Sequence, residues 1–385
     1  MHSDLRLLSR LSRRAFLRST TSLAALAQLR WVASATAPLK RSTFAYVASE
    51  QNAGNEDGSL QVYSLHSKRW AMTQRVSSRA PAYIVLSPDQ QTLYVANHVD
   101  NYEGQSRGSV EAFQIDPSNG HLRPLSQQAL SLSATLPRHM ALSPNGRLLA
   151  VAANGGAIYN VLPVSADGSL DRPRSIFKEV VGVSAQAHPN RLLFDCMGNY
   201  LLSSGFENGR PSAFSLAQNP MSRRMQRRII EVDDLGACAL HPDGTIFYVW
   251  HKGENGLSCY PYDSASGKIG EAIQKVSMPM HGDASSPKGL AIHPSGGMLY
   301  TAHSRLQAWQ IHAQDRLLSP AKHIDFDSTP GNEIITAANG ESLFVLDCLR
   351  GMIHRIAVDH LTGEPGFVED VAVIHGARSM VVKTL

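Results

Sequence analysis

A two-strand unit built around a tight turn recurs along the chain, and this repeat constrains the fold more than any other feature of the sequence. The clearest copy is ACALHPDGTIFYVWH at residues 237–251, where an apolar run and a β-branched, aromatic run flank His241-Pro242-Asp243-Gly244. Proline suits the first corner of a turn and glycine tolerates a positive φ, so this copy predicts a hairpin. The other copies occupy residues 83–97, 140–154, 191–205, 289–303 and 333–347.

The copies recur with a period near fifty residues. The residues that open the six turns are separated by 56, 52, 46, 52 and 44 positions, and they are Ser87, Ser143, Asp195, His241, His293 and Ala337. Such a period with short strands is typical of a radial or solenoid array. A third strand is predicted in each unit, at 59–65, 109–115, 157–164, 212–217, 257–262, 306–311 and 352–358. Most units then show a turn and a fourth strand, which is the make-up of a β-propeller blade.

The two ends of the chain hold complementary partial units. There are six complete hairpins but seven third strands, because the first unit, at 43–51, matches only the second strand of a repeat. Its missing inner strand is found in GARSMVVKTL at 376–385. We therefore expect an all-β, seven-bladed β-propeller with four antiparallel strands per blade, closed by the C-terminal strand joining blade one. The alternative is an open array with a frayed start.

Residues 1–37 differ from the rest and predict a twin-arginine signal peptide. Ser12-Arg13-Arg14-Ala15-Phe16-Leu17-Arg18 is followed by a short, weakly apolar run and then by small residues at 33–37. The run is too short and too polar for a membrane span, so no stable membrane insertion is expected after cleavage behind Ala35 or Ala37. The precursor would engage the twin-arginine export machinery and reach the periplasm, leaving 38–385 as a single propeller domain. The alternative is a disordered basic tail.

The charge of the chain does not favour a nucleic-acid partner. Six of the 36 Lys and Arg residues and one of the 32 Asp and Glu residues lie within 1–37, so the remainder carries a net charge of about −1. One local basic run contains Arg223, Arg224, Arg227 and Arg228, and we interpret it as a solvated outer strand and loop.

The four cysteines do not predict a metal or haem site. Cys196, Cys238, Cys259 and Cys348 are scattered without a C-x-x-C pair, which argues against zinc ribbons and covalent c-type haem. We expect small buried residues and no cofactor. Cys238 and Cys259 fall in the same blade, and the sequence leaves open whether they approach each other.

The strongest functional signal is a set of polar residues at one face of the predicted ring. In a propeller, the start of each inner strand and the end of each second strand share a face, around the mouth of the central channel. At the predicted starts lie Arg138, His139, residues 186–191, Lys288, Asn332 and Glu333; at the ends lie residues 50–52, Asn97, His98, Asn154, Glu207, residues 251–254, residues 303–305 and Asp347. Such a mouth could bind an anionic substrate and stabilise an oxyanion. The alternative is a rim of solvated loop residues.

Other common site motifs do not occur in this sequence. No pair of histidines has the spacing of H-E-x-x-H, so we expect no metal site of that kind, although separate blades could bring ligands together. Neither a G-x-S-x-G elbow nor a glycine-rich phosphate loop is found, so acyl-enzyme hydrolysis of the α/β-hydrolase type is not supported.

Two segments carry a resemblance to a known family. PRHMALSPNGRLLAVAAN at 137–154 and VLPVSADGSL at 161–170 resemble the seven-bladed lactonase family, which includes bacterial propeller-type 6-phosphogluconolactonases and the fungal carboxy-muconate lactonising enzyme. The resemblance covers about residues 43–385, and it implies a seven-bladed propeller with lactone-hydrolase activity.

The residues that the family uses are only partly retained. Of its P-H-x-H at blade four, His188 matches one histidine. Where the family begins blade five with G-P-R-H, this chain has Leu235-Gly236-Ala237-Cys238. The family's N-E aligns with His251-Lys252, with Glu254 two residues on. Its N-R aligns with His303-Ser304, with Arg305 displaced by one.

The resemblance implies a hydrolase that opens a sugar-type lactone by water attack at the channel mouth. The expected catalytic residues are His188, Glu254 and Arg305; the expected substrate-binding residues are Arg138, His139, Asn154, His251, Lys252 and His303. His188 or Glu254 would act as general base, while a basic residue holds the carboxylate or polarises the carbonyl. An exported enzyme would meet a non-phosphorylated lactone. The alternative, favoured by the displaced motif residues, is a non-catalytic periplasmic propeller that binds a ligand or protein partner; an electron-transfer propeller is a weaker third hypothesis.

Overall fold

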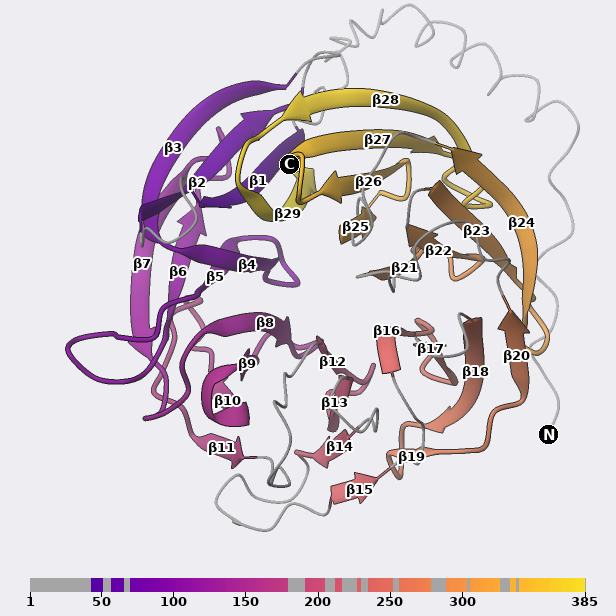
Figure 1. Ribbon diagram of the computed structural model, residues 1–385, viewed down its shortest axis with the longest axis horizontal. Helices are drawn as coiled ribbons and strands as arrows, with labels where there is room; N and C mark the ends of the chain where they lie inside the picture. Colours follow the sequence, from indigo (N-terminus) through magenta and orange to yellow (C-terminus); the bar gives the residue numbers. More distant parts are fainter. Residues whose placement is uncertain are drawn as a thin grey trace, which may run out of the picture. The chain divides into compact units, whose positions relative to one another are not determined.

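The described strands of this protein form a ring of antiparallel sheets. The computed structural model describes residues 43–50, 57–65, 70–178, 191–204, 212–216, 227–229, 235–251, 256–277, 289–302, 305–325, 333–336 and 339–384. Across these residues the strands form seven sheets, arranged side by side around a common centre (Figure 1). The expected all-β, seven-bladed propeller is therefore confirmed.

Each sheet is one blade, and its strands follow chain order outward from the centre, except that the inner strand of blade one is the last strand of the chain. Blade one contains β29 (Ala377–Thr384), β1 (Thr43–Glu50), β2 (Asp57–Ser64) and β3 (Ala71–Arg79). Blade two contains β4 (Pro81–Leu86), β5 (Thr92–Asn97), β6 (Ser109–Ile115) and β7 (Leu122–Ala129). Blade three contains β8 (Pro137–Leu142), β9 (Leu148–Ala153), β10 (Ile158–Pro163) and β11 (Ser175–Lys178), with the short 3₁₀ helix η1 (Gly155–Ala157) after β9.

The remaining blades follow the same order. Blade four contains β12 (Arg191–Phe194), β13 (Tyr200–Ser204), β14 (Ser212–Ser215) and β15 (Arg227–Ile229). Blade five contains β16 (Leu235–Leu240), β17 (Ile246–His251) and β18 (Gly256–Asp263), and its outer strand is divided into β19 (Lys268–Ile269) and β20 (Gln274–Ser277). Blade six contains β21 (Leu290–Ile292), β22 (Met298–Ala302), β23 (Arg305–Ile311) and β24 (Leu318–Asp325). Blade seven contains β25 (Glu333–Thr336), β26 (Ser342–Asp347), β27 (Met352–Val358) and β28 (Pro365–Val373).

The core lies between the blades. The second strands β5 and β26 are buried along their whole length and β9 in all but its first residue, because both faces of each sheet pack against a neighbouring blade. This explains their continuous apolar sequences, such as LLAVAA in β9. One buried cluster joins Val110 of blade two to Met140 and Leu149 of blade three, and the other blade junctions are filled in the same way.

The residue that opens each first turn has a structural task. Ser87 Oγ accepts from the backbone N–H of Thr92 at 2.9 Å, and Asp195 Oδ1 accepts from Tyr200 at 2.8 Å, so these side chains close their own turns. His241 and His293 instead reach the next blade, where Nε2 lies 3.1 Å from the carbonyl oxygen of Gly296 and 2.9 Å from that of Gly340. The same position of the repeat therefore closes the local turn in blades two and four and bonds to the next blade in blades five and six.

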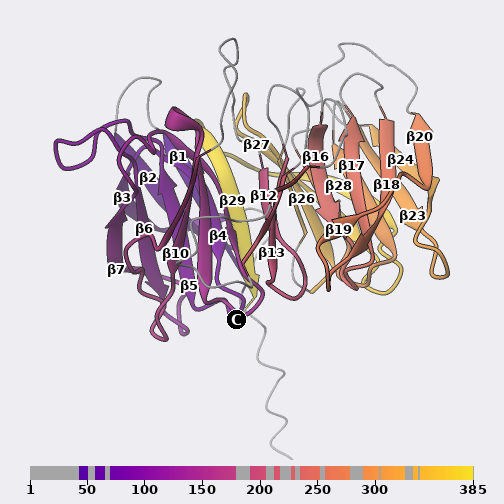
Figure 2. The ribbon, with the colours of Figure 1, turned by 90° about the horizontal axis from the view of Figure 1, so that it is seen from below.

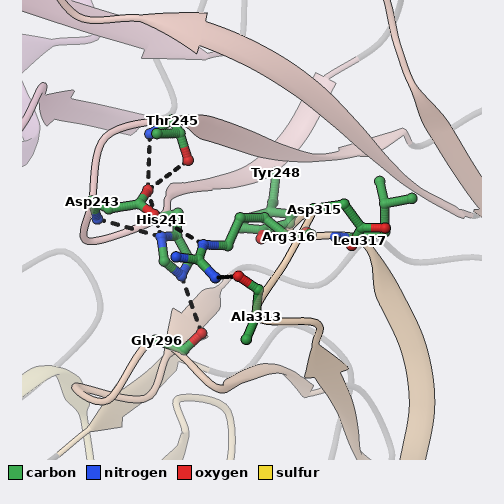
Figure 3. Close-up of polar contacts among 9 residues, drawn as sticks. All are labelled: His241, Asp243, Thr245, Tyr248, Gly296, Ala313, Asp315, Arg316 and Leu317. Carbon is green, nitrogen blue, oxygen red and sulfur yellow. Dashed lines mark hydrogen bonds and ion pairs between the residues drawn. The ribbon is translucent and has the colours of Figure 1, made fainter.

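A second set of ties joins neighbouring blades through tyrosines. A second-strand tyrosine donates its hydroxyl to a carbonyl in the outer turn of the next blade, in the pairs Tyr46–Gly120, Tyr94–Gly168, Tyr248–Arg316 and Tyr300–Gly363. All four acceptor residues have a positive φ, which glycine adopts without strain. Arg316, with φ 61°, is the exception in residue type, and its side chain extends back to blade five (Figure 3).

The C-terminal strand closes the ring. β29 pairs with β1 from Thr43↔Thr384 to Ser49↔Ala377, and the chain ends at one face of the ring (Figure 2). Arg378 Nη2 lies 2.7 Å from Glu50 Oε2 and adds an ion pair at the other end of the ladder. Before the strand, Gly376 has φ +72°, and a Cβ there would lie 1.9 Å from the carbonyl oxygen of Glu50. The predicted closure is confirmed.

The structure also answers the question about the cysteines. All four lie in described segments and are free thiols. Cys238 packs with Leu202 of blade four, whereas Cys259 packs with Leu299 of blade six, so the two side chains lie on opposite faces of blade five.

Candidate functional site

The structure places part of the predicted site at the starts of the inner strands. Arg138 and His139 lie near the start of β8, and Asn154 directly follows β9. The register Pro137↔Ala153 brings these three residues to the same end of blade three, where the Asn154 N–H donates to the carbonyl oxygen of Leu136 at 3.1 Å. Three of the predicted substrate-binding residues therefore come together.

Of the other predicted site residues, two lie in other blades and four lie outside the described residues. Arg305 begins β23, the third strand of blade six, and pairs across the sheet with Asp325, so it lies two strands outward from the inner strand β21. His251 ends β17, where its backbone pairs with Gly256. His188, Lys252, Glu254 and His303 lie outside the described residues, so their predicted roles stay predictions.

A cluster of four polar side chains lies where inner strands begin in blades two, three, four and seven. We call Tyr83, His139, Arg191 and Glu333 the central cluster. The rings of Tyr83 and His139 are 4.2 Å apart between centroids, tilted by 37°. Nδ1 of His139 accepts a hydrogen bond from the backbone N–H of Leu192 at 3.1 Å, which ties blade three to blade four.

The arginine of the central cluster extends over the ring's centre. A Cβ built on Gly289, at the start of the inner strand in blade six, would lie 3.6 Å from Nη1 of Arg191 and 3.2 Å from the backbone nitrogen of Ile334. The guanidinium therefore extends from blade four, past blade five, to blade six.

The charges of the cluster act on the Tyr83 phenol. Burial raises the pKa of Tyr83 to about 12, and the negative charge of Glu333 adds to the increase. Arg191 opposes both effects through its charge and a hydrogen bond. The carboxylate of Glu333 accepts bonds from Ser379 Oγ at 3.4 Å and from the backbone N–H of Met380 at 3.3 Å, so the closing strand helps to position it.

His139 is held in its neutral form. Burial lowers its pKa well below the ordinary value, and the charges of Arg191 and then Arg138 lower it further. Because Nδ1 accepts from Leu192, the proton of the neutral ring is on Nε2. Within the described residues this buried Nε2 has no hydrogen-bond partner.

A second polar group lies around His98, directly after β5. Burial lowers the pKa of His98, the charge of Glu50 opposes this, and the charges of Arg138 and Arg378 reinforce it. Arg378 is paired with Glu50, while Arg138 is exposed and has no recorded carboxylate partner among the described residues. The charge of Arg378 is thus balanced by Glu50, and Arg138 of blade three contributes a positive charge at the rim beside the central cluster.

The sequence analysis missed part of this arrangement. Arg191 and Glu333 were among the polar residues of the predicted face but received no role, and Tyr83 reads as a core aromatic residue. The signal that could have found them is a charged side chain at the first position of an inner strand, as in RLLF of β12 and EIIT of β25.

The described part of the chain holds neither a metal-binding cluster nor a membrane-spanning helix. No three His, Cys, Asp or Glu side chains there lie close enough together to hold a metal ion. No helix there is long and apolar enough to cross a membrane.

Comparison with known proteins identifies the family. The family described as lactonase, 7-bladed beta-propeller, matches residues 44–382. The chain belongs to this lactonase family. The resemblance seen in the sequence is therefore confirmed at the level of the family.

The relatives of this lactonase-family chain are distant. It is 22% identical over 317 residues to a 6-phosphogluconolactonase of Bacillus subtilis, covering 77% of this chain and 88% of the relative. It is 24% identical over 167 residues to a 6-phosphogluconolactonase of Pectobacterium carotovorum, covering 42% of this chain and 46% of the relative. The solved structure of a periplasmic gluconolactonase from Pseudomonas aeruginosa superposes with a TM-score of 0.74 at 19% identity, covering 89% and 99% of the two chains. At these identities the structural likeness supports the fold alone.

Proposed function

We propose that this protein is a lactone hydrolase that opens a non-phosphorylated sugar lactone at the centre of the ring. The observation that carries the proposal is the central cluster, in a chain of the lactonase family. A guanidinium, a carboxylate and a neutral imidazole meet there from separate blades. Such a set can hold a polar substrate and stabilise the negative charge that develops on a carbonyl oxygen.

The reaction needs water as its only co-reactant. The oxygen of water attacks the lactone carbonyl carbon while a general base accepts a proton. The ring C–O bond then breaks and its oxygen takes up that proton, while the new carboxyl group releases its proton to solvent and leaves the anion of a hydroxy acid. His188 or Glu254 is the proposed base, with Arg138 or Arg305 as the cation that polarises the carbonyl. General-base catalysis typically contributes about 10²–10⁴-fold, which suits an activated ester.

The proposed location supports a sugar lactone without a phosphate. The twin-arginine pattern around Arg13 and Arg14 is typical of exported proteins. The Pseudomonas aeruginosa structure is of a periplasmic gluconolactonase, whereas the two curated relatives are 6-phosphogluconolactonases. Phosphorylated sugar lactones arise inside the cell, so we propose export to the periplasm and an aldonolactone as substrate.

One observation favours a second candidate, a propeller that binds a ligand without catalysis. Ala237 stands where the family pattern has an arginine, and its side chain is only 4% exposed within the core between blades five and six. An arginine from this position is therefore missing in this chain. A binding protein would tolerate that loss, whereas a hydrolase needs another cation in its place.

A panel of aldonolactones separates the two candidates. Proton release from glucono-δ-lactone and related lactones is followed with native protein and with the same protein after heat denaturation, which measures spontaneous hydrolysis. The hydrolase proposal predicts a saturable rate above that background and a preference over 6-phosphogluconolactone. Background rates across the panel, with saturable binding of a lactone, would instead establish the binding protein.

A further inference from the structure

The imidazole of His139 presents a donor for which the described residues provide no acceptor. The backbone N–H of Leu192 donates to Nδ1 at 3.1 Å, so a neutral ring carries its proton on Nε2. The residue is only 7% exposed, and none of the described residues provides a hydrogen-bond partner for Nε2. Buried polar groups are nearly always hydrogen-bonded, so a partner that is not part of the described chain is expected at this nitrogen.

The surroundings of this donor select an acceptor with a negative charge. Arg191 and Arg138 both act on the His139 ring through their positive charges. The carboxylate of Glu333 lies close enough to act on Tyr83, but it also accepts bonds from Ser379 and Met380 of the closing strand. Among the described residues, the charges of Arg191, Arg138 and Glu333 sum to one positive charge, which suits a monoanion better than a dianion.

The geometry of the donors suits a carboxylate. A guanidinium presents parallel N–H groups that match the two oxygens of a carboxylate, and an imidazole N–H can donate to one of the same oxygens. The ring of His139 lies against Tyr83, which is hydrogen-bonded to Arg191, so these donors belong to one group of side chains.

We propose that the central cluster binds the carboxylate of a small hydroxy acid, with Nε2–H of His139 and the guanidinium of Arg191 as donors and Arg138 at the rim. The donors follow from the structure, whereas the choice of a hydroxy acid rests on the proposed function, because lactone hydrolysis produces such an anion. The site would hold the opened product and cause competitive product inhibition.

The test measures gluconate binding by calorimetry in the full-length protein, at constant ionic strength. Arg191→Met removes the guanidinium, and His139→Phe keeps a ring against Tyr83 but removes Nε2–H. Each should weaken gluconate binding by at least roughly tenfold. Arg123→Met is the matched control, because Arg123 lies near the start of the outer strand β7 in blade two, where its side chain is 71% exposed and pairs with Asp116. It should leave the affinity unchanged.

A second measurement does not depend on how the variants fold. In wild-type protein labelled with ¹⁵N-histidine, the Nε2–H signal of His139 should shift on addition of gluconate and should saturate with the affinity found by calorimetry. Absence of saturable binding, wild-type affinity in both folded variants, or tighter binding of inorganic phosphate than of gluconate would each overturn the proposal.

The outcomes also separate this inference from the proposed function. A protein that binds gluconate through Arg191 and His139 but hydrolyses no lactone overturns the proposed function and leaves the anion site standing. If the protein hydrolyses lactones but the Arg191 and His139 variants bind gluconate with wild-type affinity, the anion site alone is overturned.

Discussion

The backbone N–H of Leu192 in blade four donates a hydrogen bond to Nδ1 of His139 in blade three, and this bond determines which ring nitrogen carries the proton. A protonated imidazole would have a hydrogen on Nδ1 and would lose the bond. A contact between two blades therefore sets the chemical form of a side chain at the centre of the ring.

The first prediction concerns the response of His139 to acid. Because burial and two arginines hold its pKa below that of the unfolded chain, the unfolded chain binds more protons below about pH 6.5. The contribution of His139 to the free energy of unfolding therefore decreases as the pH falls below that value. Replacing His139 with Gln, which does not titrate, should make the free energy of unfolding less dependent on pH. Urea unfolding at pH 7 and pH 5 measures this, and equal pH dependence in both proteins would contradict it.

The second prediction concerns the backbone strain at Arg316. Its φ of 61° costs a residue with a side chain about 1–2 kcal/mol relative to glycine. Its partly exposed ion pair with Asp243, at 2.9 Å, contributes only about 0.2–1 kcal/mol. Arg316→Ala loses the ion pair and keeps the strain, whereas Arg316→Gly loses both. Urea unfolding should therefore show the Gly variant to be the more stable by about 1 kcal/mol or more. Equal stability of the two variants would show that this turn is not strained.

The third prediction concerns Asp243, beside His241 and Arg316 (Figure 3). Burial alone would raise the pKa of its carboxyl, but hydrogen bonds from Thr245, Arg316 and His241 outweigh burial and hold the pKa well below its usual value. A lowered pKa stabilises the fold above the unfolded value of about 3.9, and this stabilisation is lost as the pH falls below it. Asp243→Asn should therefore destabilise the protein at neutral pH, and the difference from wild type should shrink below about pH 4. A constant difference down to pH 3, by chemical denaturation, would refute this.

The fourth prediction tests ring closure. Deleting residues 376–385 removes β29, including the buried side chains of Ala377, Met380 and Val382, and exposes an edge of β1. The shortened protein should aggregate or lose its cooperative thermal transition. Gly376→Ala is a milder test, since its Cβ would overlap the carbonyl oxygen of Glu50, and it should lower the melting temperature. A cooperative transition near the wild-type temperature after the deletion would show that closure is dispensable.

The sequence predicted the blades because each repeat reveals its own strands and turns. The period near fifty residues, the turn at 241–244 and the complementary ends are local patterns, and they led to the observed sheets and to the closing strand. The division of the outer strand of blade five was not predicted, because outer strands are partly exposed and carry a weak hydrophobic pattern.

The central cluster could be predicted only in part. The repeat places Arg138, His139, Arg191 and Glu333 at one face, but it does not reveal how far a long side chain extends. The guanidinium of Arg191 lies beside Gly289 of blade six, a residue that is distant in sequence. Arg316 is a similar case. The equivalent turn position in the other blades holds Gly120, Gly168 or Gly363, so the repeat does not predict a side chain there that pairs with Asp243.

The most direct test of the account is the rate of glucono-δ-lactone hydrolysis in variants from several blades, each compared with its melting temperature. His188→Ala, Glu254→Ala and Arg305→Ala should each lower the turnover by about 10²-fold or more while the melting temperature is retained. Arg316→Gly, at the opposite face of the ring, should leave the rate unchanged. Full activity in all three variants would contradict hydrolysis at this face of the propeller.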